Sequence, residues 1–144
     1  MKTSARNELG GIISSITPGP VLADVCLDIG NDLSIVASIT SESIQRLQLT
    51  PGQRAIAVIK ASMVLLTPNL GLRTSARNRL PARVIASLPD TVNSAVKLEL
   101  AGGQRLTAII TNESLREQGY QPGSACCALI KSSHVILALD ESCD

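Results

Sequence analysis

Most of the polar residues that occur twice in this chain are cations or carry hydroxyls. The motif Thr-Ser-Ala-Arg-Asn occupies residues 3–7 and returns at residues 74–78, and a Lys-x-Ser motif begins at Lys60 and again at Lys131. Arginine offers a planar fork of donors that suits tetrahedral oxyanions, lysine adds a positive charge, and serine hydroxyls donate hydrogen bonds. These residue types predict a site for an oxyanion with a charge of about −2.

A second shared motif is Thr-x-Glu-Ser, which begins at Thr40 and at Thr111. Each threonine is expected to cap a short helix, whose first backbone N–H groups and dipole favour an anion. A plainer interpretation stays open, in which the threonine and the following serine (Ser43, Ser114) only cap the helix. In that interpretation Arg6 is a surface residue and Lys60 a solvated charge at a strand end.

Catalysis and metal binding are not indicated by the remaining polar residues. His134 is the only histidine, and it replaces Met63 of the first copy, so we interpret it as a surface or interface residue. The cysteines show no C-x-x-C spacing and are expected to be reduced core thiols (Cys26, Cys126, Cys127 and Cys143). We therefore expect no enzyme, no disulfide framework, no cofactor, and no metal held directly by side chains.

The composition excludes several classes of partner. The formal net charge is +1 and aromatic residues make up 1 %, so neither a basic field for duplex nucleic acid nor a base-stacking surface is predicted. Apolar runs stay shorter than the roughly 18 to 20 residues of a membrane span. The first residues are polar and give no secretory signal, which favours a cytoplasmic location.

The chain is an internal duplication. At an offset of 71 residues, about 23 of the 64 positions from 3 to 66 are identical to positions 74 to 137. This predicts a first domain over residues 1–67, a linker over 68–73 and a second domain over 74–144.

Each repeat predicts a small β-structure. Apolar residues alternate from Val21 to Ile29 and from Leu33 to Ile39 around a Gly-Asn-Asp turn, and a short helix follows Thr40. Further strands are expected over Ala55–Ile59 and after Val64. The fold class is therefore mainly β, with two tandem small barrels of the oligonucleotide/oligosaccharide-binding (OB) type, each with one short helix. Units of this size are marginal alone, so we expect them to bury apolar surface against each other and against other chains.

These motifs together resemble the molybdate-binding Mop family, in its tandem form known as molbindins. The resemblance implies a trimer of two-domain chains that hold molybdate or tungstate between subunits. It also implies which residues contact the oxyanion: Ser4, Ala5, Arg6, Lys60, Ala61 and Ser62 with Thr40 and Ser43, and Ser75, Ala76, Arg77, Lys131, Ser132 and Ser133 with Thr111 and Ser114. An additional anion site near a three-fold axis would involve Val21, Val92 and Asn93, although the first copy lacks the asparagine.

The predicted function is cytoplasmic binding, storage and homeostasis of molybdate by hydrogen bonds and charge. Molybdate is fully deprotonated at neutral pH, whereas phosphate keeps a proton that a pocket made only of donors would leave facing a donor, at a cost of roughly 1 to 3 kcal/mol. Two alternatives stay open. One is a molybdate-sensing module that acts through a transport or transcription partner. The other is a module for single-stranded nucleic acid, which would need aromatic residues that this chain lacks.

Overall fold

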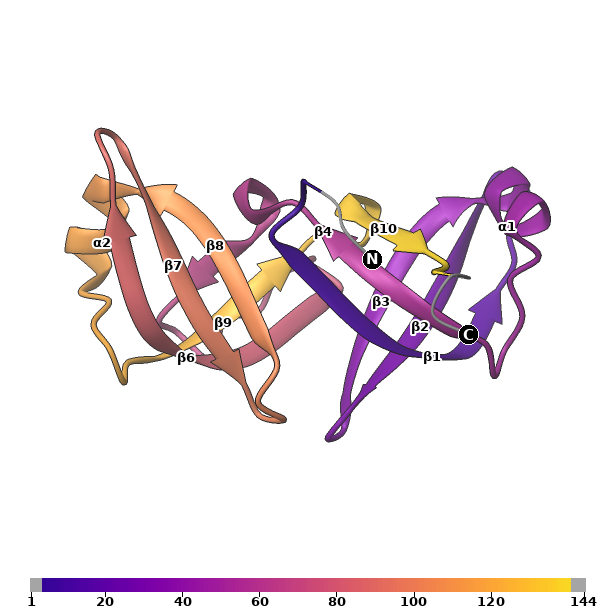
Figure 1. Ribbon diagram of the computed structural model, residues 1–144, viewed down its shortest axis with the longest axis horizontal. Coiled ribbons are helices and arrows are strands. Elements are labelled where there is room, and N and C mark those ends of the chain that lie inside the picture. The colour runs from indigo at the N-terminus through magenta and orange to yellow at the C-terminus, as the bar shows by residue number, and fades with distance from the viewer. Residues whose placement is uncertain (1–3, 141–144) are drawn as a thin grey trace.

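The computed structural model describes residues 4–140, and within them the chain is mainly β (Figure 1). The first repeat contains β1 (Asn7–Thr17), β2 (Leu22–Gly30), β3 (Leu33–Thr40), α1 (Ser41–Leu47), β4 (Arg54–Ile59), the 3-10 turn η1 (Ala61–Met63) and β5 (Leu65–Thr67). The second repeat contains β6 (Asn78–Pro89), β7 (Asn93–Leu100), β8 (Arg105–Thr111), α2 (Asn112–Gln118), β9 (Ala125–Ile130), the 3-10 turn η2 (Ser132–His134) and β10 (Val135–Ala138).

The alternation in β2 produces the predicted buried face. Ala23, Val25, Leu27 and Ile29 are each at most 7 % exposed. Val21, which was expected on the same face, is 71 % exposed and precedes the strand, so that part of the prediction is wrong. The reason lies in the backbone, because the Val21 carbonyl accepts a hydrogen bond from the Ser41 N–H at the start of α1. Val92 stands in the equivalent place and is 64 % exposed.

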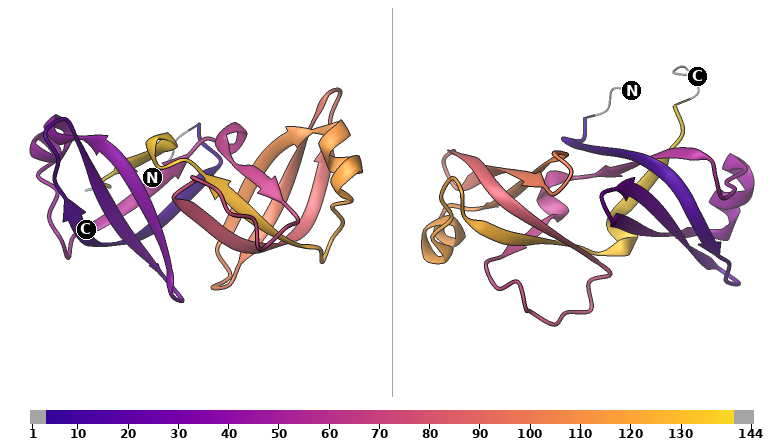
Figure 2. Two further views of the ribbon diagram at one scale, coloured as in Figure 1. Left: turned by 180° about the vertical axis from the view of Figure 1, so that it is seen from behind. Right: turned by 90° about the horizontal axis from the view of Figure 1, so that it is seen from below.

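The strands form two curled five-stranded sheets, with the orders β10-β4-β1-β2-β3 and β5-β9-β6-β7-β8. Each sheet therefore contains four strands of one repeat and the closing strand of the other. β10 pairs with β4 through Val135 and Ile59, and β5 pairs with β9 through Leu65 and Leu129. The sequence predicts these closing strands but not their exchange, which joins the two lobes seen in Figure 1. The linker runs from β5 to β6 of the same sheet as a wide loop (Figure 2), and the chain crosses between the lobes earlier, between β4 and β5.

The two repeats also share one hydrophobic cluster. Large buried side chains from both repeats belong to it, among them Ile13, Leu27, Leu80 and Leu98. This confirms the expectation that the repeats bury apolar surface against each other.

The thiols are in part where the sequence placed them. Cys126 and Cys127 are buried and unpaired, whereas Cys26 is half-buried rather than in the core because it lies on the outer face of β2. Burial raises the pKa of the Cys126 thiol to about 11, so the reactive thiolate is scarce at neutral pH. Cys143 lies outside the described residues.

Candidate functional site

The sheet register brings the arginine and the lysine of each repeat together. Asn78 of β6 lies opposite Ile130 of β9 as the last pair of their ladder, and Arg77 and Lys131 directly flank this pair, just outside the two strands. Arg6 and Lys60 flank the pair formed by Asn7 and Ile59 in the same way. Two cations that lie 54 residues apart in the sequence thus form one positive site in each repeat.

Each positive site faces a strand of the other repeat. The Asn78 side chain accepts a hydrogen bond from the Val36 N–H at 2.7 Å and donates one to the Val36 carbonyl at 2.9 Å. Val36 lies in β3, the edge strand of its sheet, so the amide caps backbone groups that have no neighbouring strand. Asn7 does the same for Thr107 in β8, with distances of 2.8 and 2.6 Å.

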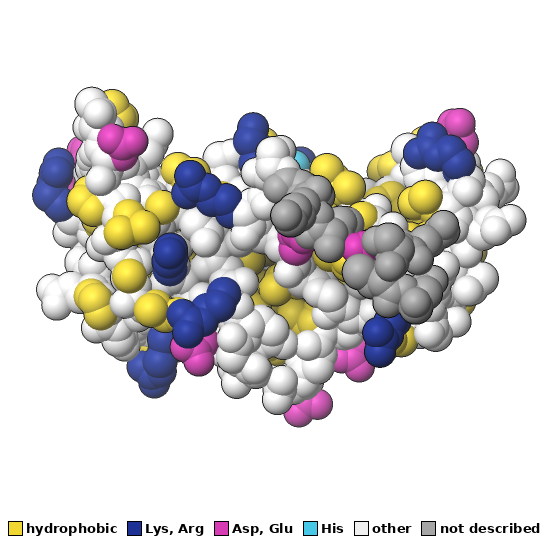
Figure 3. All heavy atoms as spheres, in the orientation of Figure 1, with side chains coloured by type: hydrophobic (Ala, Val, Ile, Leu, Met, Phe, Trp, Pro, Cys, Tyr) yellow, Lys and Arg dark blue, Asp and Glu magenta, His cyan; other side chains and the backbone are white. Residues whose placement is uncertain are grey.

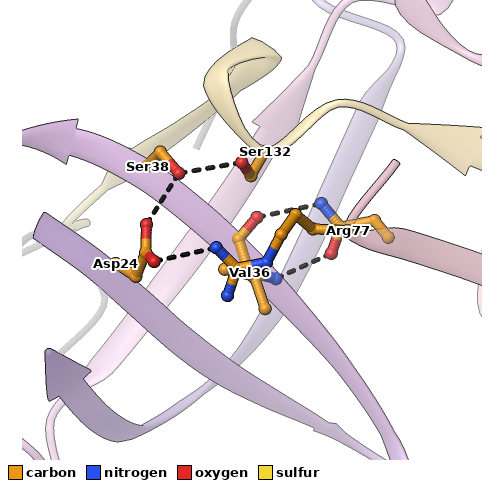
Figure 4. Close-up of polar contacts among 6 residues, drawn as sticks. Asp24, Val36, Ser38, Arg77 and Ser132 are labelled. Carbon is orange, nitrogen blue, oxygen red and sulfur yellow. Dashed lines mark hydrogen bonds and ion pairs between the residues drawn. The ribbon is translucent and has the colours of Figure 1, made fainter. Parts of the chain in front are cut away.

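Around Arg77 the facing strands contribute two polar side chains. The guanidinium Nη1 lies 2.8 Å from a carboxylate oxygen of Asp24, and the other oxygen accepts a hydrogen bond from Ser38 at 2.8 Å. The Ser38 and Ser132 hydroxyl oxygens are also 2.8 Å apart. Figure 4 shows these four side chains converging, with Asp24 and Ser38 on β2 and β3 of the first repeat. We call Arg77, Lys131, Ser132, Asp24 and Ser38 the Arg77 cluster.

The ion pair sets the charge state of this cluster. Hydrogen bonds from Arg77 and from Ser38 hold the pKa of the Asp24 carboxyl below its usual value, although desolvation acts in the opposite direction. Asp24 is therefore ionised at neutral pH, and the Arg77 guanidinium already has an anionic partner within the chain.

The residues equivalent to Asp24, Ser38 and Ser132 in the other half are apolar. The duplication offset of 71 residues places Ala95 at the position of Asp24, Ile109 at that of Ser38, and Ala61 at that of Ser132. Ala95 and Ile109 form a cross-strand pair between β7 and β8, as Asp24 and Ser38 do between β2 and β3. We call these three residues, with Arg6 and Lys60, the Arg6 cluster.

The helix starts confirm the predicted caps. Thr40 Oγ1 accepts from the Ser43 N–H at 3.1 Å and donates to Ser43 Oγ at 2.8 Å. Thr111 and Ser114 repeat this arrangement at 3.1 and 3.0 Å. Because each serine hydroxyl accepts from the threonine, its own proton remains available for a further acceptor. Thr40 is the last residue of β3, and β3 contacts η2 through the hydrogen bond between Ser38 and Ser132. The Thr40 cap therefore lies two residues along the strand from the contact with Ser132.

The other predicted contact residues are mostly at the surface. Ala61 and Ser132 are buried at 4 % and 8 % exposure, and Ala5 and Ala76 are half-buried. The remaining residues of the two motifs are exposed, as are the three residues expected near a three-fold axis (Ser4, Arg6, Lys60, Ser62, Ser75, Arg77, Lys131, Ser133, Val21, Val92 and Asn93).

Sequence reasoning missed the residues that the opposite repeat contributes. Asp24 and Ser38 looked like outward-facing polar residues of alternating strands, and only the pairing of the repeats brings them to Arg77. Asn7 and Asn78 did carry a signal, since both directly follow the arginine in each copy. Their burial at 1 % and 2 % shows that this part of the repeated motif is structural.

Neither a metal centre nor a membrane helix is found in the described part of the chain. Residues 4–140 contain no group of three or more His, Cys, Asp or Glu side chains that could hold a metal ion. Over the same residues, no helix is long and apolar enough to cross a membrane. On the face drawn in Figure 3, basic side chains gather over the lobe that contains β6 to β8.

Comparison with known proteins gives consistent matches over the whole chain. The family model described as "TOBE domain" matches residues 3–66 and 74–137. The molybdenum transport protein ModE of Azotobacter vinelandii is 40 % identical over 139 residues, and the molybdenum-pterin-binding protein MopB of Rhodobacter capsulatus is 39 % identical over 140 residues. Both matches cover 96 % of this chain but only 52 % of the relative, so the chain spans about half the length of these curated relatives.

A solved structure also matches over nearly the full length of the chain. It is a crystal structure of the cytoplasmic molybdate-binding protein ModG with molybdate bound, 40 % identical, with a TM-score of 0.94. The match covers 97 % of this chain and 100 % of that one.

Proposed function

The chain belongs to the TOBE domain family, carrying two copies of the domain in tandem, and from this premise we propose that it binds molybdate or tungstate. The relatives named for molybdenum binding confirm the resemblance to the Mop proteins. The proposed role is cytoplasmic storage and homeostasis of the oxyanion, without catalysis.

The observation that carries this proposal is that Arg6 and Lys60, and likewise Arg77 and Lys131, flank the last residue pair of one β-ladder. A β-sheet does not need two cations side by side, and like charges at adjacent positions destabilise it. A dianion bound between them would remove that repulsion and accept hydrogen bonds from both.

The ligand class follows from the donors. Guanidinium, ammonium, hydroxyl and backbone N–H groups can all donate to a fully deprotonated tetrahedral oxyanion. A protonated phosphate would leave one donor unpaired, at a cost of about 1 to 3 kcal/mol. Sulfate carries no proton, so cavity size must exclude it. We propose that the contacts come from the predicted set (Ser4, Ala5, Arg6, Thr40, Ser43, Lys60, Ala61 and Ser62, and Ser75, Ala76, Arg77, Thr111, Ser114, Lys131, Ser132 and Ser133).

We further propose that the chain assembles with copies of itself, as a trimer. Equivalent positions of the two repeats expose large apolar side chains. Leu65 and Ile136 are 64 % and 65 % exposed on the exchanged strands, and Val21 and Val92 are 71 % and 64 % exposed. Contact with other chains would bury these patches, and would complete an axial anion site at Val21, Val92 and Asn93.

Calorimetric titration tests the proposed function. The protein is titrated with molybdate, tungstate, sulfate and phosphate, and the first two are expected to bind at far lower concentration. Arg6→Ala and Arg77→Ala are each expected to abolish or weaken one class of sites, because each removes a bidentate donor. Unchanged stoichiometry and affinity in both variants would refute the site assignment, and native mass spectrometry would refute the trimer if it gave a monomer.

A second candidate function is that of a sensing module acting through a partner. The match to half the length of the ModE transport protein favours it. Cellular molybdenum content separates the two roles. A store predicts that cells lacking this protein hold less molybdenum at the same supply, whereas a sensor predicts altered expression of uptake proteins.

A further inference from the structure

The two cation sites of this chain differ at three equivalent positions. The Arg77 cluster has a carboxylate and two hydroxyls where the Arg6 cluster has Ala95, Ile109 and Ala61. The difference cannot come from the general scaffold, because the buried asparagine that docks each repeat on the other is the same in both halves.

The Asp24 carboxylate uses the same donors that an oxyanion needs. It lies 2.8 Å from Arg77 Nη1, and it reaches Ser132 through the Ser38 hydroxyl. Donors of two predicted ligand contacts, Arg77 Nη1 and the Ser132 hydroxyl, are therefore engaged by the chain itself (Figure 4). The carboxylate also leaves the Arg77 cluster with one net positive charge, whereas the Arg6 cluster has two.

We propose that Asp24 is an affinity-determining residue that makes the two halves of the chain unequal. The Arg6 cluster takes up the oxyanion first. The Arg77 cluster takes it up at higher concentration, because the dianion must displace the Asp24 carboxylate from the guanidinium or bind beside it. This inference rests on the proposed function.

The expected effect is moderate. The Arg77 and Asp24 side chains are 50 % and 38 % exposed, so water screens the repulsion between the carboxylate and the incoming dianion. We expect the two classes of sites to differ in Kd by about tenfold.

The experiment compares calorimetric titrations of molybdate into the wild type and four variants. Asp24→Asn keeps the size of the side chain and can still accept from Ser38, but it removes the charge. It is expected to tighten the weaker class by about tenfold and to leave the stoichiometry unchanged. Asp32→Asn, in the exposed turn after β2, changes the net charge equally and is expected to bind like the wild type. Ala95→Asp places a carboxylate beside Arg6 and is expected to weaken the tighter class, whereas Ala95→Asn controls for its bulk.

The possible outcomes separate this inference from the proposed function. A wild type that binds no molybdate refutes both. A wild type that binds with a single affinity, unchanged in Asp24→Asn, refutes only the inference. Weaker binding in a folded Asp24→Asn variant also refutes it, because Asp24 would then orient Arg77 for the ligand rather than compete with it. If Asp24→Asn does not fold, the pair Ala95→Asp and Ala95→Asn decides, and equal Kd values in these two variants refute the inference.

Discussion

The docking asparagines allow a quantitative prediction about what holds the two repeats together. Asn78 is 2 % exposed, and its side-chain amide makes both of its hydrogen bonds to the backbone of Val36. Replacing it with alanine removes both bonds and leaves an N–H and a carbonyl of an edge strand without a partner. Asn7→Ala does the same to Thr107 in the other half.

The magnitude follows from the number of groups affected. A net hydrogen bond contributes about 0.5 to 1.5 kcal/mol, and a buried group left unpaired costs about 1 to 3 kcal/mol. Since Val36 is only half-buried, water can reach part of its backbone, and the expected loss for Asn78→Ala is about 2 to 4 kcal/mol of unfolding free energy. Asn69→Ala is the matched control. Asn69 lies exposed in the linker and its side chain accepts one local hydrogen bond, so the loss of stability is expected below about 0.5 kcal/mol.

Urea unfolding followed by circular dichroism measures these differences. With a slope of about 2 kcal/mol per molar urea, Asn78→Ala is expected to lower the midpoint by about 1 to 2 M without changing the slope. A midpoint that stays within the error of the Asn69→Ala control would show that the amide does not hold the repeats together. The reasoning about edge capping would then be wrong.

Three further predictions concern other parts of the chain. Leu137→Ala is expected to speed amide hydrogen exchange in β4 of the first repeat more than in β9 of its own repeat, because β10 pairs with β4; the reverse order would contradict the strand exchange. Burial raises the pKa of Tyr120 to about 12, and its hydroxyl is buried without a hydrogen-bond partner among residues 4–140. Tyr120→Phe removes this unpaired group and is expected to raise the free energy of unfolding by about 1 kcal/mol in thermal denaturation. A loss of stability would show that the hydroxyl has a partner. The pKa of Asp24 is lowered in the folded chain, so its ion pair stabilises the folded state fully above the ordinary aspartate pKa of about 3.9. This contribution is lost as the pH falls through the lower pKa of the folded state, so the stability difference between the wild type and Asp24→Asn should shrink below about pH 4. A difference that stays constant with pH would contradict the ion pair.

Most of the fold could be predicted because its signals are local. The alternation of Ala23, Val25 and Leu27 fixes the buried face of β2, and the Thr-x-Glu-Ser motif places the helix start at Thr40. The strand exchange has no local signal. Leu65 and Ile136 are equivalent residues of equivalent strands, so either strand satisfies either sheet, and only the spatial course of the chain decides between them.

The candidate site was predictable only in the part that each repeat contributes by itself. Arg77 and Lys131 belong to repeated motifs, and antiparallel pairing of the strands that carry them brings them together. Asp24 has no counterpart in the second copy, so a comparison of the repeats discards it as noise. Its contact with Arg77 depends on how the two repeats dock, which the sequence of one repeat does not contain.

The exchanged strands have a consequence for the history of the gene. Once β5 and β10 had crossed over, neither half could be deleted without leaving the survivor with an unpaired edge at β4 or β9. A lone copy could regain a fifth strand by folding its own closing strand back or by exchanging it with another molecule. Fusion in tandem makes this exchange internal to one chain, so the pairing of the closing strands does not depend on protein concentration.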